Sequence, residues 1–312
     1  ISYLIFSIAD SFLILLVARM LGGFGGSNIG VAQAYIADIT TKDERAKGMG
    51  MIGAAFGLGF VFGPLIGGIL SEYGYWVAGL GSAAFSFLSM IFAIFFLPES
   101  NKKLKSAQEK SYKLFDIKYA RKVFGYPRVG LLILIFFIIV FSMANIYGTF
   151  SLLGFRVYGF SDAQNGYLFG IIGIVGTIMQ GGVIRHLTKI FSDELLVKMG
   201  IFGMMLGLAL LPYGVSFTGA VIIVIILSIG TGMLQPTILS MISKYSPESE
   251  QGAILGINQS VSAFARVLGP LWGGFAFEYI GYEFPFLTGG LFTLITLIIT
   301  IFYLKSDRKK AE

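Results

Sequence analysis

Long apolar segments constrain this chain more than any other feature, because each is about as long as a bilayer is thick. A helix of about 20 apolar residues crosses a membrane. The segments are continuous rather than alternating, which favours helices over strands. We therefore predict an all-α polytopic membrane protein. The predicted spans, with ends good to about four residues, are 12–36, 47–70, 76–97, 129–153, 164–184, 195–215, 219–242, 252–276 and 283–304.

The composition agrees with a lipid environment and argues against several other functions. Hydrophobic residues make up 55% of the chain and charged residues 13%, too apolar an exterior for a soluble fold. There is no cysteine, and the single histidine, His186, lies in a polar stretch. We therefore expect no metal and no cofactor. An enzyme is not expected either, because the predicted spans carry no embedded Ser–His or metal pair.

Basic residues predict the orientation of the chain. Lys and Arg gather on one side of the predicted spans, where the 98–128 segment and the 305–312 tail carry most of them, while the other side receives only Arg156. Because such an excess marks the cytoplasmic side, we predict a cytoplasmic connector and C-terminus in an inner or plasma membrane. This bias explains the net charge of +6, so no nucleic-acid partner is expected.

A repeated motif divides the chain into two related halves. The segment 63–68 (GPLIGG) recurs as 269–274 (GPLWGG), and the same offset of 206 residues aligns Glu44 with Glu250 and Glu72 with Glu278. Internal repeats of this kind are typical of secondary transporters. We predict an N-terminal bundle over 1–97, a cytoplasmic connector over 98–128, a C-terminal bundle of six spans over 129–304 and a tail over 305–312. By symmetry, we expect the first half to lack two spans and most of a third, about 65 residues at ordinary span lengths.

Several motifs resemble those of the major facilitator superfamily, and among its members those of the twelve-span drug/proton antiporters that include tetracycline exporters. Residues 19–26 (RMLGGFGG) resemble the Arg and glycine-rich face of the fourth span in that family. Residues 59–68 (GFVFGPLIGG) match the fifth-span antiporter motif G-x-x-x-G-P-x-x-G-G, and 97–100 (LPES) is similar to the end of the sixth span. The resemblance implies the major-facilitator fold, with two pseudo-symmetric six-helix bundles.

The resemblance also implies roles for particular residues. Arg19, within a span, would act on an acid of the first span, although a simple tie between helices is the alternative. Asp38 would pair with a basic loop to latch one state, or it is a solvated end residue. Residues 182–189 look like a degenerate copy of that gating loop or a plain basic turn. The expected coupling and gating residues are Arg19, Asp38, Gly59, Gly63, Pro64, Gly67, Gly68, Gly269 and Pro270.

Glycines at every fourth position allow close helix packing, and a proline among them can bend the helix. Substrate contacts should come from polar and aromatic groups that face a central cavity. The candidates are Asn28, Gln33, Asn145, Tyr147, Gln180, Gln235, Asn258, Gln259 and Arg266. Arg266 lines that cavity or lies in a packing seam.

The expected function is secondary transport, specifically the proton-coupled efflux of drugs or other small amphipathic compounds by alternating access. The partners are a small-molecule substrate, protons and the lipid bilayer, and the protein is expected to be a monomer. All 17 Asp and Glu residues lie in loops or at span ends, so the proton-carrying acid is expected in the lacking spans. A proton-coupled nutrient symporter, for example for a sugar, and a non-transporting scaffold or sensor are the alternatives.

Overall fold

The computed structural model describes residues 1–25, 65–99, 117–247 and 250–304, with isolated positions between 32 and 63. The predicted spans 12–36 and 47–70, and most of the connector, therefore lie partly outside the described residues. The chain separates into two compact units, Ile1–Tyr112 and Lys113–Glu312.

The N-terminal unit is built on close contacts between small residues. Its described helices are α1 (Ser2–Ser7), α2 (Phe12–Gly25) and α5 (Tyr75–Phe96), and α1 packs against both others. A Cβ built on Gly79 of α5 would lie 2.7 Å from the Ser7 Cβ of α1, and one built on Gly22 of α2 would lie 3.1 Å from the Ser2 Oγ. Glycine at these two positions lets the short helix approach both neighbours closely.

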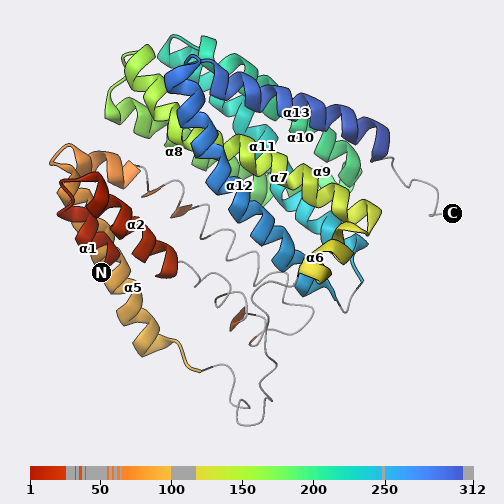
Figure 1. Cartoon of the computed structure of the whole chain (residues 1–312), viewed down its shortest axis with the longest axis horizontal. Coiled ribbons are helices and arrows are strands. Elements are labelled where there is room, and N and C mark those ends of the chain that lie inside the picture. Colours follow the sequence, from red (N-terminus) through yellow and green to blue (C-terminus); the bar gives the residue numbers. More distant parts are fainter. Residues whose placement is uncertain are drawn as a thin grey trace. The chain divides into compact units, whose positions relative to one another are not determined.

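The C-terminal unit is a helical bundle (Figure 1). A short helix, α6 (Ile117–Phe124), precedes α7 (Pro127–Leu152), which continues through the π-helical turn η2 (Leu153–Val157). The remaining elements are α8 (Asp162–Ile178), η3 (Met179–Val183), α9 (Ile184–Ile190), α10 (Asp193–Leu210), η4 (Leu211–Tyr213), α11 (Phe217–Tyr245), α12 (Gln251–Tyr279) and α13 (Phe284–Tyr303).

Local sequence signals explain where these helices begin. Ser161 forms a capping box with Gln164 at the start of α8, and the hydroxyls of Ser192 and Ser216 accept hydrogen bonds from the first turns of α10 and α11. Such caps satisfy backbone N–H groups that the helix leaves free. Pro127 begins α7 at the position where a missing N–H has no cost.

The predicted spans from α5 onward agree with the observed helices to within about five residues, except in two places. The helical run from α8 passes through η3 and α9 as far as Ile190, so the prediction of a loop or turn at 182–189 is wrong. A π-helical turn absorbs Gly181 and Gly182 without ending the helix. The predicted connector contains α6, which packs on α7.

Six helical runs of the described residues are long and apolar enough to cross a membrane: Tyr75–Phe96, Pro127–Val157, Asp162–Ile190, Asp193–Tyr213, Phe217–Tyr245 and Phe284–Tyr303. α12 has 29 residues, as many as α11, and is long enough to cross a membrane, but polar residues such as Asn258, Gln259 and Arg266 make it less apolar than these six runs. Polar side chains of a membrane helix need protein or water around them. α12 is therefore the helix of this unit on which a functional site is expected.

Candidate functional site

The buried face of α12 packs along α7. This face consists mostly of small residues at spacings of three and four: Ile254, Asn258, Ser262, Ala265, Gly269, Gly273 and Ala276. A Cβ built on Gly269 would lie 2.7 Å from both the Asn145 N and the Phe141 O of α7. Any side chain at Gly269 would collide with the backbone of α7, so the two helices touch through the glycines of the GPLWGG motif.

Asn145 of α7 lies at the centre of this contact. It is fully buried, and its Nδ2 donates a hydrogen bond to the backbone carbonyl of Pro285 in α13. Gly273 of α12 lies against its Oδ1, which has no hydrogen-bond partner among the described residues, and the Oγ of nearby Ser142 has none either. Buried polar atoms without a partner are rare and costly, so this crossing is polar and incompletely satisfied.

The N-terminal end of α12 is held by a cluster of charged and phenolic groups. The Lys122 Nζ of α6 lies 2.6 Å from the Glu250 Oε1, and the hydroxyls of Tyr119 and Tyr126 donate to the Glu250 Oε2 at 3.1 and 3.4 Å. The hydrogen bond from Lys122 lowers the pKa of Glu250, and the same bond raises the pKa of Lys122. The carboxylate thus fixes α6 to the start of α12.

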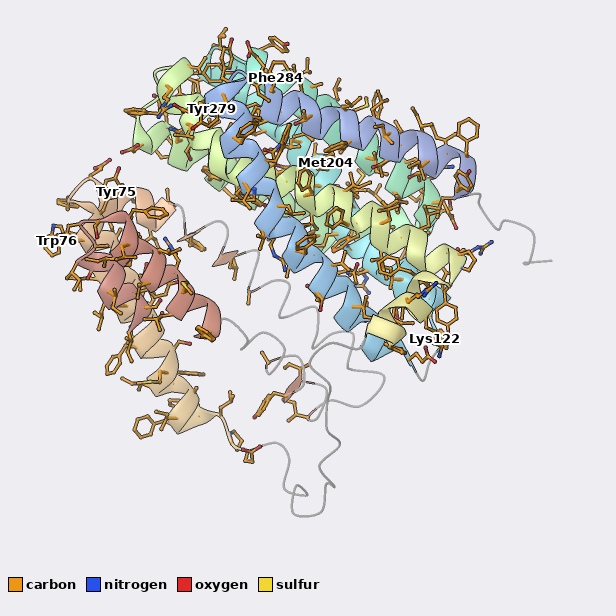
Figure 2. All side chains as sticks on the ribbon, viewed as in Figure 1. Tyr75, Trp76, Lys122, Met204, Tyr279 and Phe284 are labelled. Atoms are coloured by element: carbon orange, nitrogen blue, oxygen red, sulfur yellow. The ribbon has the colours of Figure 1, made fainter. Side chains whose placement is uncertain are left out.

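The other end of α12 carries a second ion pair. Glu278 accepts a hydrogen bond from the Arg156 Nη1 of η2 at 2.9 Å, and both side chains are more than half exposed. Lys122 on α6 and Tyr279, the last residue of α12, mark the two ends in Figure 2. α12 is therefore joined to the α6–α7–η2 segment by charge at both ends and by glycine contacts between them.

The exposed side of α12 carries a stripe of polar and small residues. We define the α12 stripe as Gly256, Gln259, Ala263, Arg266 and Pro270, which recur at alternating spacings of three and four and are all exposed in this unit. On a helix such residues lie in one line. A Cβ on Gly148 of α7 would lie 3.9 Å from the Pro270 Cβ, so the stripe continues toward the neighbouring Tyr147, which is 45% exposed.

The predicted cavity residues of this unit fall into two groups. Tyr147, Gln180, Gln235, Gln259 and Arg266 are exposed on its surface. By contrast, Asn145 and Asn258 are fully buried inside the bundle, where they cannot contact a solute in this arrangement. Both amide atoms of Asn258 also have no partner within the part of the chain that the structure describes.

In the N-terminal unit the structure places only some of the predicted residues. Arg19 is exposed on α2, and its guanidinium carbon lies 4.8 Å from the centre of the Phe6 ring of α1, a cation–π contact. Gly67 and Gly68 lie in the helical residues 65–71, and Gly59 and Gly63 are helical isolated positions. Asn28, Gln33, Asp38 and Pro64 lie outside the described residues.

Sequence reasoning missed the cluster around Glu250 and the ion pair of Glu278. The repeat pointed to both acids, because it aligns them with Glu44 and Glu72. It did not indicate their partners, which come from α6 and η2, segments read only as connector and span end. No group of His, Asp and Glu side chains that could hold a metal occurs among the described residues.

Comparison with known proteins agrees with this fold. The family profile of the Major Facilitator Superfamily matches residues 1–270 and 198–312. Multidrug resistance protein 1 of Bacillus subtilis is 28% identical over all of this chain and 79% of its own length. The class C tetracycline resistance protein of Escherichia coli is 28% identical over 87% of this chain and 68% of its own length.

Solved structures are similar too. The crystal structure of the human organic anion transporter MFSD10 covers 96% of this chain and 74% of its own, with 25% identity and a TM-score of 0.71. A bacterial homologue of the lysosomal transporter Spinster shares the fold at 17% identity and a TM-score of 0.60. The protein is therefore a multi-pass membrane transporter of small molecules and not an enzyme. The chain belongs to the major facilitator superfamily.

Proposed function

We propose that this protein is a proton-coupled exporter of small amphipathic compounds that works by alternating access. Relatives named for multidrug and tetracycline resistance support efflux. The proposed orientation has the connector and C-terminus in the cytoplasm, and the proposed unit of function is a monomer.

The observation that carries the proposal is the glycine contact of α12 with α7. Gly269 and Gly273 meet the backbone of α7, while Pro270 lies between them and removes one helical hydrogen bond. A proline in a helix is a point of bending. Because the same Gly-Pro motif occurs in both halves of the chain, we infer that Gly59, Gly63, Pro64, Gly67 and Gly68 serve the first half as Gly269 and Pro270 serve the second.

Unpaired polar atoms beside this contact support a second arrangement of α12. The Ser142 Oγ, the Asn145 Oδ1 and the Asn258 amide are buried without partners among the described residues. In a different position of α12 these groups could form hydrogen bonds with protein or water. The free energy gained from those bonds would offset part of the free energy needed to break the present helix contact. The ion pairs at the two ends of α12 are both at least partly exposed, so breaking them costs little free energy.

Proton coupling requires a titratable group in the pathway, and the described Asp and Glu residues all lie at helix ends or in turns. We propose that the proton-carrying acid lies outside the described residues. Arg19 would control it, because its guanidinium is exposed on α2 and, among the described residues, lies over the Phe6 ring without an ion pair, which leaves its charge available. Asp38 would close the pathway at the cytoplasmic end.

The test is substrate-dependent proton movement in proteoliposomes that contain the full chain. A lipophilic cation, a neutral compound and an amphipathic anion are each added to vesicles that hold a pH gradient monitored with a fluorescent dye. Efflux coupled to protons predicts that at least one compound dissipates the gradient and that Arg19→Ala abolishes this effect while the protein stays in the membrane. A sugar is added in a parallel sample, where sugar-driven proton uptake would instead identify a nutrient symporter. No flux with any of these compounds would identify a scaffold or sensor.

A further inference from the structure

A cavity of about 270 Å³ lies between α9, α11 and the start of α10. Six of its eight lining residues are polar: Arg185 and Thr188 of α9, Asp193 of α10, and Thr237, Ser240 and Lys244 of α11. Pockets for drug-sized ligands have about 300–1,000 Å³ and are mostly apolar. This cavity is therefore suited to a smaller and more polar group, and it is separate from the α7–α12 contact.

The cavity carries two cations and one anion. The Lys244 Nζ lies 2.5 Å from the Asp193 Oδ2, and the exposed Arg185 supplies the second cation. An ammonium group has three N–H donors, so the bond to Asp193 leaves two of them for a ligand. With two positive charges and one negative charge, the lining has a net formal charge of +1. A ligand with a single negative charge would neutralise it.

The three hydroxyls of the lining differ in what they can offer. Thr237 donates to the Met233 carbonyl at 2.7 Å, and Thr188 donates to the Arg185 carbonyl at 3.2 Å. Ser240 is exposed, and among the described residues no hydrogen bond of its hydroxyl is found. Ser240 is therefore the hydroxyl that can donate to a ligand beside the two cations.

The cavity lies at the level of lipid headgroups. The 29 residues of α11 measure about 43 Å at 1.5 Å per residue, and a bilayer with its headgroups is about 40–45 Å thick. Lys244 is the last residue but one of α11, and Asp193 begins α10. Basic residues predict that this side is cytoplasmic, where anionic lipids attract Lys and Arg. The ligand groups nearest to the cavity are therefore lipid phosphates.

We propose that this cavity binds the phosphodiester of an anionic phospholipid such as phosphatidylglycerol, with Arg185 and Lys244 on its free oxygens and Ser240 as a further donor. Arginine binds phosphate through two parallel hydrogen bonds, and lysine binds it as a point charge. A phosphodiester has one negative charge, which equals the net positive charge of the lining. The inference concerns a lipid and does not depend on the proposed export.

The face of α11 beside the cavity suits an acyl chain. Pro236 lines the cavity, and Ile229 and Ile222 precede it by 7 and 14 residues, which places all three on one side of the helix. Both isoleucines are exposed in this unit, at 38% and 55%. An acyl chain whose phosphate occupies the cavity can therefore lie along α11 toward the middle of the membrane. This feature favours a lipid over a soluble phosphate ester.

The experiment measures equilibrium binding of short-chain lipids to the purified, delipidated full chain. The probes are dioctanoyl phosphatidylglycerol, dioctanoylglycerol, which lacks the phosphate, and glycerophosphoglycerol, which lacks the acyl chains. The complete lipid should bind at least ~10-fold more tightly than either fragment, because charged hydrogen bonds and apolar contacts both contribute. Arg185→Gln and Lys244→Gln should each weaken binding of the complete lipid by about 10-fold and leave dioctanoylglycerol unaffected.

Two further variants separate a built site from general attraction to a basic surface. Lys189→Gln removes one exposed positive charge from α9 outside the cavity lining, and it should leave the affinity nearly unchanged. Ser240→Phe keeps both cations but fills the cavity, and it should remove the preference for phosphatidylglycerol over dioctanoylglycerol. Unchanged binding in Ser240→Phe, or an equal loss in Lys189→Gln and Arg185→Gln, would overturn the assignment of the cavity.

The probes also test the ligand itself. Equal binding of phosphatidylglycerol and dioctanoylglycerol would overturn the role of the phosphate. If glycerophosphoglycerol binds as tightly as the complete lipid, the ligand is a soluble phosphodiester and the lipid assignment is wrong. Equal binding of the zwitterionic dioctanoyl phosphatidylethanolamine would overturn the preference for an anionic headgroup.

Discussion

Two helix pairs in the C-terminal unit are joined through glycine, and they differ in what surrounds the contact. In the α10–α11 pair, a Cβ on Gly230 would lie 2.5 Å from the Met204 N and 2.7 Å from the Gly200 O, and one on Gly203 would lie 3.2 Å from the Gly230 Cα. The neighbouring side chains, among them Leu227 and Leu234, are apolar and buried. The one buried hydroxyl of α11 near this contact, that of Ser228, donates to the Val224 carbonyl.

In the α7–α12 pair, equally close backbones are surrounded by polar groups that are only partly satisfied. The same residue type thus serves two purposes. An apolar contact whose polar atoms are all hydrogen-bonded is stable in one packing arrangement. A polar contact that has unpaired atoms and a proline beside it tolerates a second arrangement. The difference assigns α10–α11 to the fixed frame of the unit and α7–α12 to its proposed movement.

The largest effect is expected at the α10–α11 contact. Gly230→Ala places a methyl group against two backbone atoms that cannot move separately, so the free energy of unfolding should fall by about 3 kcal/mol. The measurement is an unfolding titration in detergent. Gly256→Ala, where no described atom lies within 4 Å of the new Cβ, is the control and should be neutral or slightly stabilising. A tolerated Gly230→Ala would remove the distinction between the two contacts.

A substitution at the α7–α12 contact is expected to lower stability less, and transport more, than a substitution at the α10–α11 contact. The methyl group of Gly269→Ala also meets backbone atoms, but α12 can shift about Pro270. We therefore expect the free energy of unfolding to fall by about 2 kcal/mol. We also expect slower turnover, because the shifted helix would favour one of the two transport conformations. Gly274→Ala in the same helix, with open space at its Cβ among the described residues, is the matched control for both measurements. If both variants transport like the unmodified protein, Gly269 is plain packing.

Asn258 tests whether the unpaired atoms belong to a second arrangement. Asn258→Leu removes two buried polar atoms that have no partner in the described structure, so stability in the present arrangement should rise by about 1 kcal/mol. Transport should fall, because the amide would no longer be available to the other state. Thermal unfolding and flux measured on the same preparation check both. A rise in stability with full transport would show that the amide has no part in the cycle.

The smallest effect is expected from the ion pair at the start of α12. Because the pKa of Glu250 is lowered and that of Lys122 is raised, their mutual stabilisation is complete at neutral pH. It is lost as pH falls through the lowered pKa of Glu250, or as pH rises through the raised pKa of Lys122. Lys122→Gln should therefore lower the melting temperature slightly at pH 7 and not at all at a pH where Glu250 is protonated. A difference that persists in acid would assign the effect to packing of the Lys122 stem.

The sequence predicted the helices well because membrane spans follow directly from apolar length, and the ends of α11 and α13 were placed within about three residues. It also pointed to Gly269, Pro270 and Arg266, since a repeated proline and an intramembrane cation are conspicuous in an apolar chain. The first prediction needed a comparison of segments 206 residues apart, and the second needed only local composition.

The sequence did not reveal that Asn145 is buried and Gln259 exposed, and both were proposed as cavity residues. In a membrane helix the lipid-facing and buried sides are both apolar, so periodicity does not reveal which side a polar residue lies on. The buried bond from Asn145 to Pro285 joins residues 140 positions apart, and the pairing of Lys122 with Glu250 joins residues 128 apart. Contacts of this range depend on how the helices pack and cannot be read from local sequence.

Distances between spin labels test the proposed movement most directly. The chain has no cysteine, so pairs of introduced cysteines carry the only labels. One pair replaces the exposed Leu134 of α7 and Leu271 of α12, and the other replaces the exposed Phe202 of α10 and Ile222 of α11. On addition of a transported compound at varied pH, the α7–α12 distance should shift or split into two populations while the α10–α11 distance stays single. An unchanged α7–α12 distance during active transport, or an equal shift in both pairs, would contradict a transport cycle based on the glycine contact of α12.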